Sequence, residues 1–194
     1  MPPPPPGSST CWSVRDATVR WHGVNELVLE VLRTFHAELA GEEIAMRLEL
    51  ARQLPPVAGH NGQFHEVIIN LVDTGIAALR AIKGERRELT VRTEDQKGRS
   101  VIFELEDTGP GIDPNRSDRI FDAFTSTKPD GIGLGLAICQ RIVERHNGQI
   151  SVSPAHPHGC IFRVVLPASS RSSSVLTVAK PRRASTPIEE QKGY

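Results

Sequence analysis

The sequence has no excess of charge of either sign. Its 194 residues contain 23 Lys and Arg and 23 Asp and Glu, so the formal net charge is zero. A protein that attracts nucleic acid through its overall field carries a basic excess, so we do not expect a nucleic-acid partner. Long apolar runs are also missing, because no stretch approaches the ~18 residues of a membrane span. The N-terminal letters MPPPPPGSST lack the basic and apolar regions of a secretory signal.

Cysteine is scarce and forms no recognisable pairing pattern. The three cysteines are Cys11, Cys139 and Cys160, an odd number without a Cys-x-x-Cys pair. Cys139 and Cys160 stand in apolar runs, where a free cysteine behaves as a small hydrophobic residue. These observations favour a reduced thiol state and predict a cytoplasmic location.

The composition predicts one folded domain between two tails. A hydrophobic content of 38% over this length is enough for one core. Residues 1–20 begin with five prolines and small polar residues, and we predict a disordered lead. Residues 168–194 are rich in serine with a small basic excess, and we predict a disordered tail. A short edge strand in the letters VLTVA is an alternative for part of that tail. We therefore predict that residues 21–167 form the folded domain.

Hydrophobic spacing predicts alternating helices and strands within that domain. Helical spacing is seen from Val24 to Phe35, over residues 62–83 and over residues 134–146, whereas alternation or short apolar runs predict strands at 44–50, 88–94, 101–107, 148–154 and 160–167. Antiparallel strands with helices gathered on one face predict an α+β fold, a two-layer sandwich with a mostly antiparallel sheet. Residues 112–130 lack periodicity, and we predict a functional lid or binding loop there.

Three glycines precede the last predicted helix at alternate positions, in the letters DGIGLGLAI. Glycine loses more conformational freedom on folding than any other residue. Placing Gly131, Gly133 and Gly135 just before a helix is therefore costly in entropy. One interpretation is a flexible surface turn. The other is a phosphate cradle, in which bare N–H groups and the positive end of the helix face an anion. Neither common nucleotide fingerprint fits the spacing, so this stretch alone leaves both open.

Four segments together resemble a known family. IINLVDTGIAAL, EDTGPGI, IFDAF and GIGLGLAI occur in this order and resemble the N, G1, F and G2 boxes of the ATP-binding domain of sensor histidine kinases. That domain has the Bergerat fold, shared with DNA gyrase, Hsp90 and MutL. The resemblance covers residues 24–167, and the segment from FTSTKPDG onward looks like the nitrogen- and oxygen-sensing branch. It implies an ATP-binding protein-histidine kinase domain of a two-component system, with ATP and Mg²⁺ as cofactors.

The resemblance assigns the nucleotide base to the G1 segment. Asp107 ends an apolar strand, and an ionised carboxylate only accepts hydrogen bonds, which suits the amine of adenine. The resemblance implies this contact, with Gly109 and Gly111 giving the base room and Ile112 beside it. The alternative is that Asp107 only forms the turn before Thr108.

The resemblance assigns the phosphates to the predicted lid and the glycines after it. Its implied nucleotide contacts are Asn70, Phe124, Thr127, Lys128, Gly131, Gly133, Leu134, Gly135 and Leu136. Lys128 would bring a point charge to the terminal phosphate, and a solvated loop lysine is the alternative. Phe121 and Phe124 resemble the pair that packs the hinge of the lid, a role that can coincide with ordinary core packing. On this interpretation the glycines let the lid close over a triphosphate.

The N-box segment departs from the family at one position. Asn70 and Thr74 share one face of a helix because they are four residues apart. In histidine kinases both positions are usually Asn, and the second coordinates Mg²⁺. Thr74 is the candidate metal ligand of this chain, because a Thr hydroxyl can ligate Mg²⁺, although it reaches less far than an Asn side chain. Asn70 stands where hydrolysing relatives have a Glu that acts as general base, so we expect slow ATP hydrolysis.

No histidine of this chain matches the phosphoacceptor motif. His65-Glu66 lacks the proline expected after it and lies in the N-box helix, while His156 and His158 suggest at most adventitious metal binding. The leading hypothesis is therefore a catalytic module that phosphorylates a histidine on a dimerisation hairpin supplied in trans or by a lost N-terminal part, with a response regulator downstream. A degenerate nucleotide-binding module and, third, an anti-sigma-type serine kinase are the alternatives.

Overall fold

A computed structural model of the chain describes residues 20–21, 23–82, 86–113, 119–124 and 133–169. The described strands are β1 (Arg20–Trp21), β2 (Ala45–Glu49), β3 (Val57–Ala58), β4 (Glu88–Asp95), β5 (Ser100–Asp107), β6 (Gln149–Pro154) and β7 (Cys160–Pro167). The described helices are α1 (Val24–Gly41), α2 (Asn61–Arg80) and α3 (Gly135–Arg145). The strands form one large sheet and one small one.

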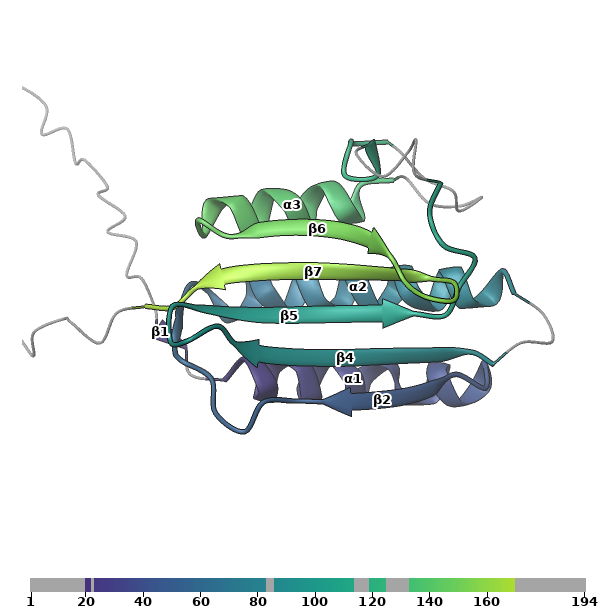
Figure 1. Cartoon of the computed structure of the whole chain (residues 1–194), viewed down its shortest axis with the longest axis horizontal. Coiled ribbons are helices and arrows are strands. Elements are labelled where there is room, and N and C mark those ends of the chain that lie inside the picture. Colours follow the sequence, from purple (N-terminus) through teal and green to yellow (C-terminus); the bar gives the residue numbers. More distant parts are fainter. Residues whose placement is uncertain (1–19, 22, 83–85, 114–118, 125–132, 170–194) are drawn as a thin grey trace, which may run out of the picture.

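The large sheet has the order β2-β4-β5-β7-β6 (Figure 1). Only the β2–β4 pair is parallel, and the other three pairs are antiparallel. In the β5–β7 pair Ser100 lies opposite Pro167, and Asp107 lies opposite Cys160. This register brings the end of β5 directly to the start of β7.

All three helices lie on one face of this sheet (Figure 1). Each helix turns its apolar residues to the strands, as the 3.6-residue spacing requires. In α2 the fully buried side chains include Leu71, Val72, Ile76 and Leu79. They meet the alternate residues of β4 and β5 that point toward the helices, among them Leu89 and Leu105. The core is therefore a single layer between sheet and helices, and the α+β two-layer prediction is confirmed.

A small sheet joins three distant parts of the chain. β1 pairs antiparallel with β3, and Val57 of β3 also forms a bridge with Ala168. The Ala168 N–H donates to the Arg99 carbonyl at 2.8 Å, and the Ser169 N–H donates to the Pro56 carbonyl at 2.7 Å. The first two residues of the predicted tail are thus hydrogen-bonded to the domain, whereas 170–194 lie outside the described residues.

The spacing predicts the long elements correctly and misses the short ones. Each predicted helix and strand of the domain corresponds to an observed one. Helix α1 continues six residues beyond the predicted end at Phe35, and the ends of α2 and α3 are displaced by one to three residues. The two-residue strands β1 and β3 have no counterpart in the sequence analysis, because two residues carry no periodicity. They are identified only by their pairing.

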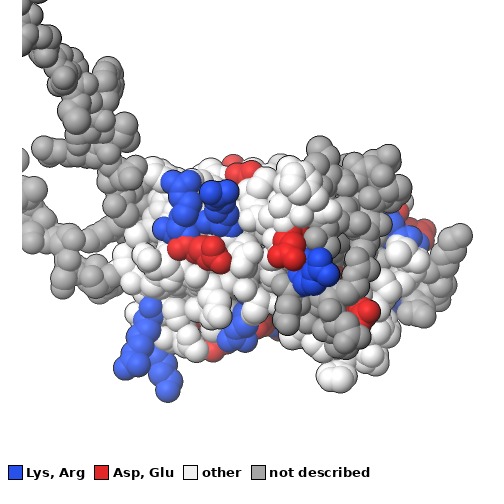
Figure 2. Space-filling model, turned by 90° about the horizontal axis from the view of Figure 1, so that it is seen from above, with Lys and Arg blue, Asp and Glu red and all other residues white. Residues whose placement is uncertain are grey.

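The described helices include none with the length and apolarity needed to cross a membrane. Acidic and basic side chains are interspersed on the face seen in Figure 2, without a continuous region of one sign. This distribution agrees with the balanced composition.

Candidate nucleotide-binding site

Asp107 is a buried carboxylate at the end of β5. Only 1% of the residue is exposed. Its Oδ1 accepts a hydrogen bond of 2.8 Å from the Gly109 N–H, and the backbone of Cys160 on the adjacent strand also hydrogen-bonds the carboxyl. These two donors fix the carboxylate at the exit of the strand.

Burial dominates the electrostatics of this group. Loss of solvent raises the pKa of Asp107 from 3.8 to about 6, although the hydrogen bonds from Gly109 and Cys160 oppose that rise. A carboxylate of this kind is ionised at pH 7 but incompletely satisfied, since it has about four acceptor positions. It is suited to accept a further donor from a ligand.

The turn after Asp107 approaches helix α2 closely. A Cβ on Gly109 would stand 2.7 Å from Asp107 Oδ1 and 3.0 Å from the Ala78 Cβ. Only glycine fits this gap, because real Cβ atoms do not come so near. Gly111 follows with φ 81°, and Ile112 is half-buried against the core. The G1 residues of the sequence analysis therefore lie together at the C-terminal half of α2.

Asn70 lies two turns earlier on the same helix. A Cβ on Gly135, the first residue of α3, would be 3.3 Å from Asn70 Oδ1. The side-chain amide also hydrogen-bonds the Cys139 thiol, whose pKa burial raises to about 12. Asn70 is thus in contact with the first turn of α3.

Thr74 stands between Asn70 and Ala78 on α2. Its hydroxyl donates to the Asn70 carbonyl at 2.7 Å, so the oxygen is tied to the helix backbone while its lone pairs remain as acceptors. Hydroxyl and amide oxygens are hard donors of the kind that Mg²⁺ takes together with phosphate oxygens. The donor chemistry therefore fits the metal that the resemblance implies, with a shorter reach than Asn would give.

The start of α3 carries the last part of the predicted phosphate segment. Gly133 has φ 71°, and Leu134 is the N-cap residue, without a side-chain cap hydrogen bond. The first N–H groups of a helix have no partner within it and carry a partial positive charge. Leu136 packs partly buried against the core. An anion beyond this end of α3 would be stabilised by that partial charge.

Phe124 is not a core residue. Its exposed fraction is 76%, so the alternative of ordinary core packing does not apply to Phe124, whereas Phe121 is half-buried. The backbone, not the ring, makes the connection here, because the Phe124 N–H donates to the Gly133 carbonyl at 3.0 Å. Thr127, Lys128 and Gly131 lie outside the described residues.

The loop between β6 and β7 lies against the Asp107 turn, although no sequence pattern predicts it there. His158 Nδ1 lies 2.9 Å from the Thr108 carbonyl oxygen. A Cβ on Gly159 would stand 1.8 Å from the Asp107 carbonyl oxygen, and Cys160 pairs with Asp107. The letters HGC before a strand carry no sign of this, because the contact depends on the β5–β7 register.

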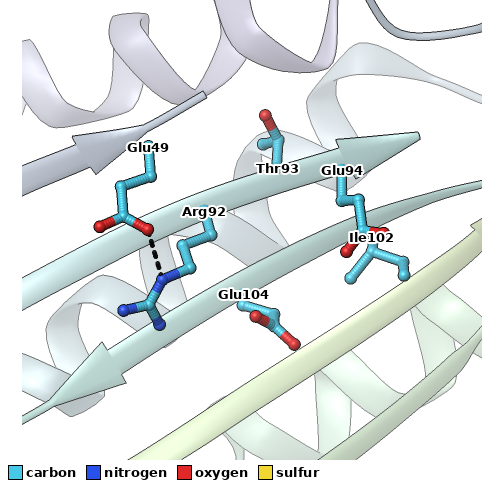
Figure 3. A pocket seen from close by; sticks show the side chains of 6 residues that line it. All are labelled: Glu49, Arg92, Thr93, Glu94, Ile102 and Glu104. Carbon is cyan, nitrogen blue, oxygen red and sulfur yellow. Dashed lines mark hydrogen bonds and ion pairs between the residues drawn. The ribbon is translucent and has the colours of Figure 1, made fainter. Parts of the chain in front are cut away.

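A separate hollow of about 210 Å³ lies away from these residues (Figure 3). Glu49, Arg92, Thr93, Glu94, Ile102 and Glu104 line it. Three of its four charged residues have partners, since Arg92 Nε donates to Glu49 at 2.7 Å and Arg163 donates to Glu104 at 2.7 Å. The hydrogen bond from Arg92 is the main reason why the pKa of Glu49 is lowered. Strand alternation puts Asp107 on the opposite, helix-covered face, so we do not assign the ligand to this hollow.

Comparison with known families gives the arrangement its context. The family described as "Histidine kinase-, DNA gyrase B-, and HSP90-like ATPase" matches residues 59–170, a range that includes Asn70, Asp107 and the start of α3. The chain belongs to this family of ATPases. Its curated relatives are sensor kinases: it is 32% identical to the sensor protein TdiS of Thauera aromatica over 74% of this chain and 26% of TdiS. It is 33% identical to the C4-dicarboxylate transport sensor protein DctS of Rhodobacter capsulatus, over 74% of this chain and 22% of DctS.

Solved structures agree with this membership. The catalytic domain of the histidine kinase ThkA superposes with a TM-score of 0.68 at 29% identity, covering 77% of this chain and 94% of that one. A second structure contains ThkA in complex with the response regulator TrrA, with a TM-score of 0.66 at 27% identity over 78% and 42%. The chain thus corresponds to a nearly whole kinase catalytic domain but to about a quarter of the length of TdiS and DctS. The family implies ATP binding.

Proposed function

We propose that this chain is the ATP-binding catalytic module of a two-component sensor histidine kinase. It transfers the γ-phosphoryl group of ATP to a histidine on a dimerisation hairpin, which in turn supplies a response regulator. The observation that carries the proposal is the buried, incompletely satisfied carboxylate of Asp107 beside the Gly109 gap. In this proposal the carboxylate accepts the amine of adenine.

Helix α2 supports this proposal by its length. Ala78 lies at the Asp107 turn, and Asn70 lies at the first turn of α3. Eight residues of α-helix separate these positions by about 12 Å. An extended nucleotide with its base at Asp107 would place its phosphates near Asn70 and the first turn of α3. The N–H groups at the start of a helix favour an anion there.

Phosphoryl transfer in such a site depends on positioning and charge stabilisation. The residues proposed to act in the transfer are Asn70 and Lys128, while Thr127 and Gly131 of the predicted lid are proposed to contact the nucleotide. Thr74 would hold Mg²⁺, which would offset the charge of the phosphates when bound. Because Asn70 is an amide and not a general base, water is not activated and ATP is retained for the histidine.

A single assay separates the candidate functions. The purified chain is incubated with γ-labelled ATP, Mg²⁺ and a separately purified dimerisation hairpin of a sensor kinase. Acid-labile label on the hairpin histidine supports the proposal. Nucleotide binding without transfer favours the second candidate, a degenerate nucleotide-binding module. Two features support this candidate: Thr74 stands where the family usually has Asn, and its hydroxyl is bonded to the Asn70 carbonyl. Label on serine of an anti-anti-sigma partner would favour the third candidate, a serine kinase.

A further inference from the structure

The hydrogen bonds around Asp107 run through one peptide group. The Thr108–Gly109 peptide donates its N–H to Asp107 Oδ1 at 2.8 Å. The carbonyl of the same residue pair, Thr108 O, lies 2.9 Å from His158 Nδ1. A carbonyl only accepts, so the imidazole donates from Nδ1. His158 and Asp107 therefore bind opposite ends of one planar unit.

Planarity makes this arrangement rigid. The C=O and N–H of a trans peptide point in opposite directions in one plane, so fixing the carbonyl also fixes the direction of the N–H. Hydrogen bonds in series polarise one another, and a donor on the carbonyl makes the N–H a better donor to the carboxylate. The imidazole thus acts on Asp107 without touching it.

The β6–β7 loop has little freedom to place His158 elsewhere. The Ala155 N–H donates to the Gly159 carbonyl at 3.0 Å and closes the loop. Gly159 has φ 108° and lies directly against the Asp107 carbonyl, and a Cβ on Gly111 would be 3.4 Å from Gly159 O. Loop and turn are therefore in direct contact on both sides of the shared peptide.

We propose that His158 is a positioning residue that orients the Asp107 carboxylate for nucleotide recognition through the Thr108–Gly109 peptide. This inference rests on the proposed function for its ligand, but the positioning itself exists in the free protein. It assigns a role in base recognition to a loop outside the four sequence boxes.

The charged groups around Asp107 determine how its pKa should change when His158 is replaced. Glu106 raises the pKa of Asp107, and His158 lowers it. The Cys160 thiol stands beside the carboxyl, and its own pKa is raised to about 12 by burial, while α2 presents the apolar Ala78. Loss of the imidazole removes a group that favours the ionised form, so Asp107 should titrate at higher pH.

The test compares His158→Ala, His158→Asn and His156→Ala with the wild-type chain. Asparagine carries an amide nitrogen in the place of Nδ1, and His156 is an exposed histidine of the same loop. NMR follows the Gly109 amide proton and the Asp107 carboxyl carbon from pH 4 to 8 without nucleotide. Calorimetry at pH 8 measures the affinity for a non-hydrolysable ATP analogue.

We expect His158→Ala to move the Gly109 amide upfield, to raise the midpoint of the Asp107 titration and to weaken binding roughly threefold, the effect of one exposed hydrogen bond. His158→Asn should restore the amide shift and the affinity, and His156→Ala should change neither. Equal Gly109 shifts and Asp107 midpoints in His158→Ala and His156→Ala would overturn the inference. The NMR readouts need no ligand, so a wild-type chain that fails to bind the analogue would refute the proposed function separately.

Discussion

Replacement of Asp107 by Asn is expected to stabilise the free domain while it strongly weakens nucleotide binding. The native carboxyl has a pKa of about 6 because it is desolvated, whereas 3.8 applies when it is exposed. The folded chain therefore holds a proton at pH values where the unfolded chain has released it. The stability that this group contributes is complete below pH 3.8, falls as the pH rises toward 6, and is constant above about pH 7.

The size of the effect follows from the same two values. A difference between 3.8 and about 6 corresponds to about 3 kcal/mol. Asparagine does not titrate, so the free energy of unfolding of Asp107→Asn should rise by about that amount relative to wild type between pH 4 and pH 7.5. Other carboxyl groups titrate in both proteins and cancel in the comparison.

Urea unfolding of both chains at pH 4, 5, 6 and 7.5 measures this difference. Glu94→Gln, which removes an exposed carboxyl from β4, controls for the loss of one negative charge. Calorimetry with an ATP analogue at pH 7.5 should show strongly weakened binding to Asp107→Asn, because half of the acceptor carboxylate becomes a donor. A stability difference that does not vary with pH would refute the burial argument, and unchanged affinity would refute the assignment of the base.

Three further substitutions test other parts of the site. Thr74→Asn should strengthen Mg²⁺-dependent binding of an ATP analogue, because its amide oxygen reaches farther than the hydroxyl tied to the Asn70 carbonyl, and an unchanged Mg²⁺ titration would contradict the metal assignment. Gly135→Ala should weaken nucleotide binding by crowding Asn70 Oδ1 at 3.3 Å, whereas Gly62→Ala, in open space on α2, should leave binding unchanged and gain up to about 1 kcal/mol of stability. Gly159→Ala should lower the free energy of unfolding in urea by more than about 3 kcal/mol, since its Cβ would stand 1.8 Å from Asp107 O. Gly98→Ala, also at positive φ but without neighbours within 4 Å, should lower it by about 1 kcal/mol. Equal losses of stability in the two variants would contradict the clash.

The sequence predicts the parts of the site that lie within one element or one turn. Asp107 and Asn70 are predicted through the resemblance of EDTGPGI and IINLVDTGIAAL to the G1 and N boxes. Both signals are local in the chain. The order of the four boxes adds the family, while the hydrophobic spacing already predicts the α+β fold.

Contacts that depend on strand register could not be predicted in this way. His158 meets Thr108 fifty residues away only because β5 and β7 pair with Asp107 opposite Cys160. The exposure of Phe124 was also missed, because two aromatic residues three apart look the same in a core and on a surface. In both cases the deciding information is tertiary, which periodicity does not contain.

The small sheet of β1 and β3 has a consequence for how this domain can be attached to others. Its bridge to Ala168 brings the first and last described segments to one corner, two strand spacings or about 10 Å apart. Asp107 lies at the far end of β5, seven residues from Ser100, or about 23 Å along the strand. A host protein could therefore carry this domain as an insertion through both ends at once, and a short covalent link between the two ends would yield a circular chain whose Asp107 end stays open.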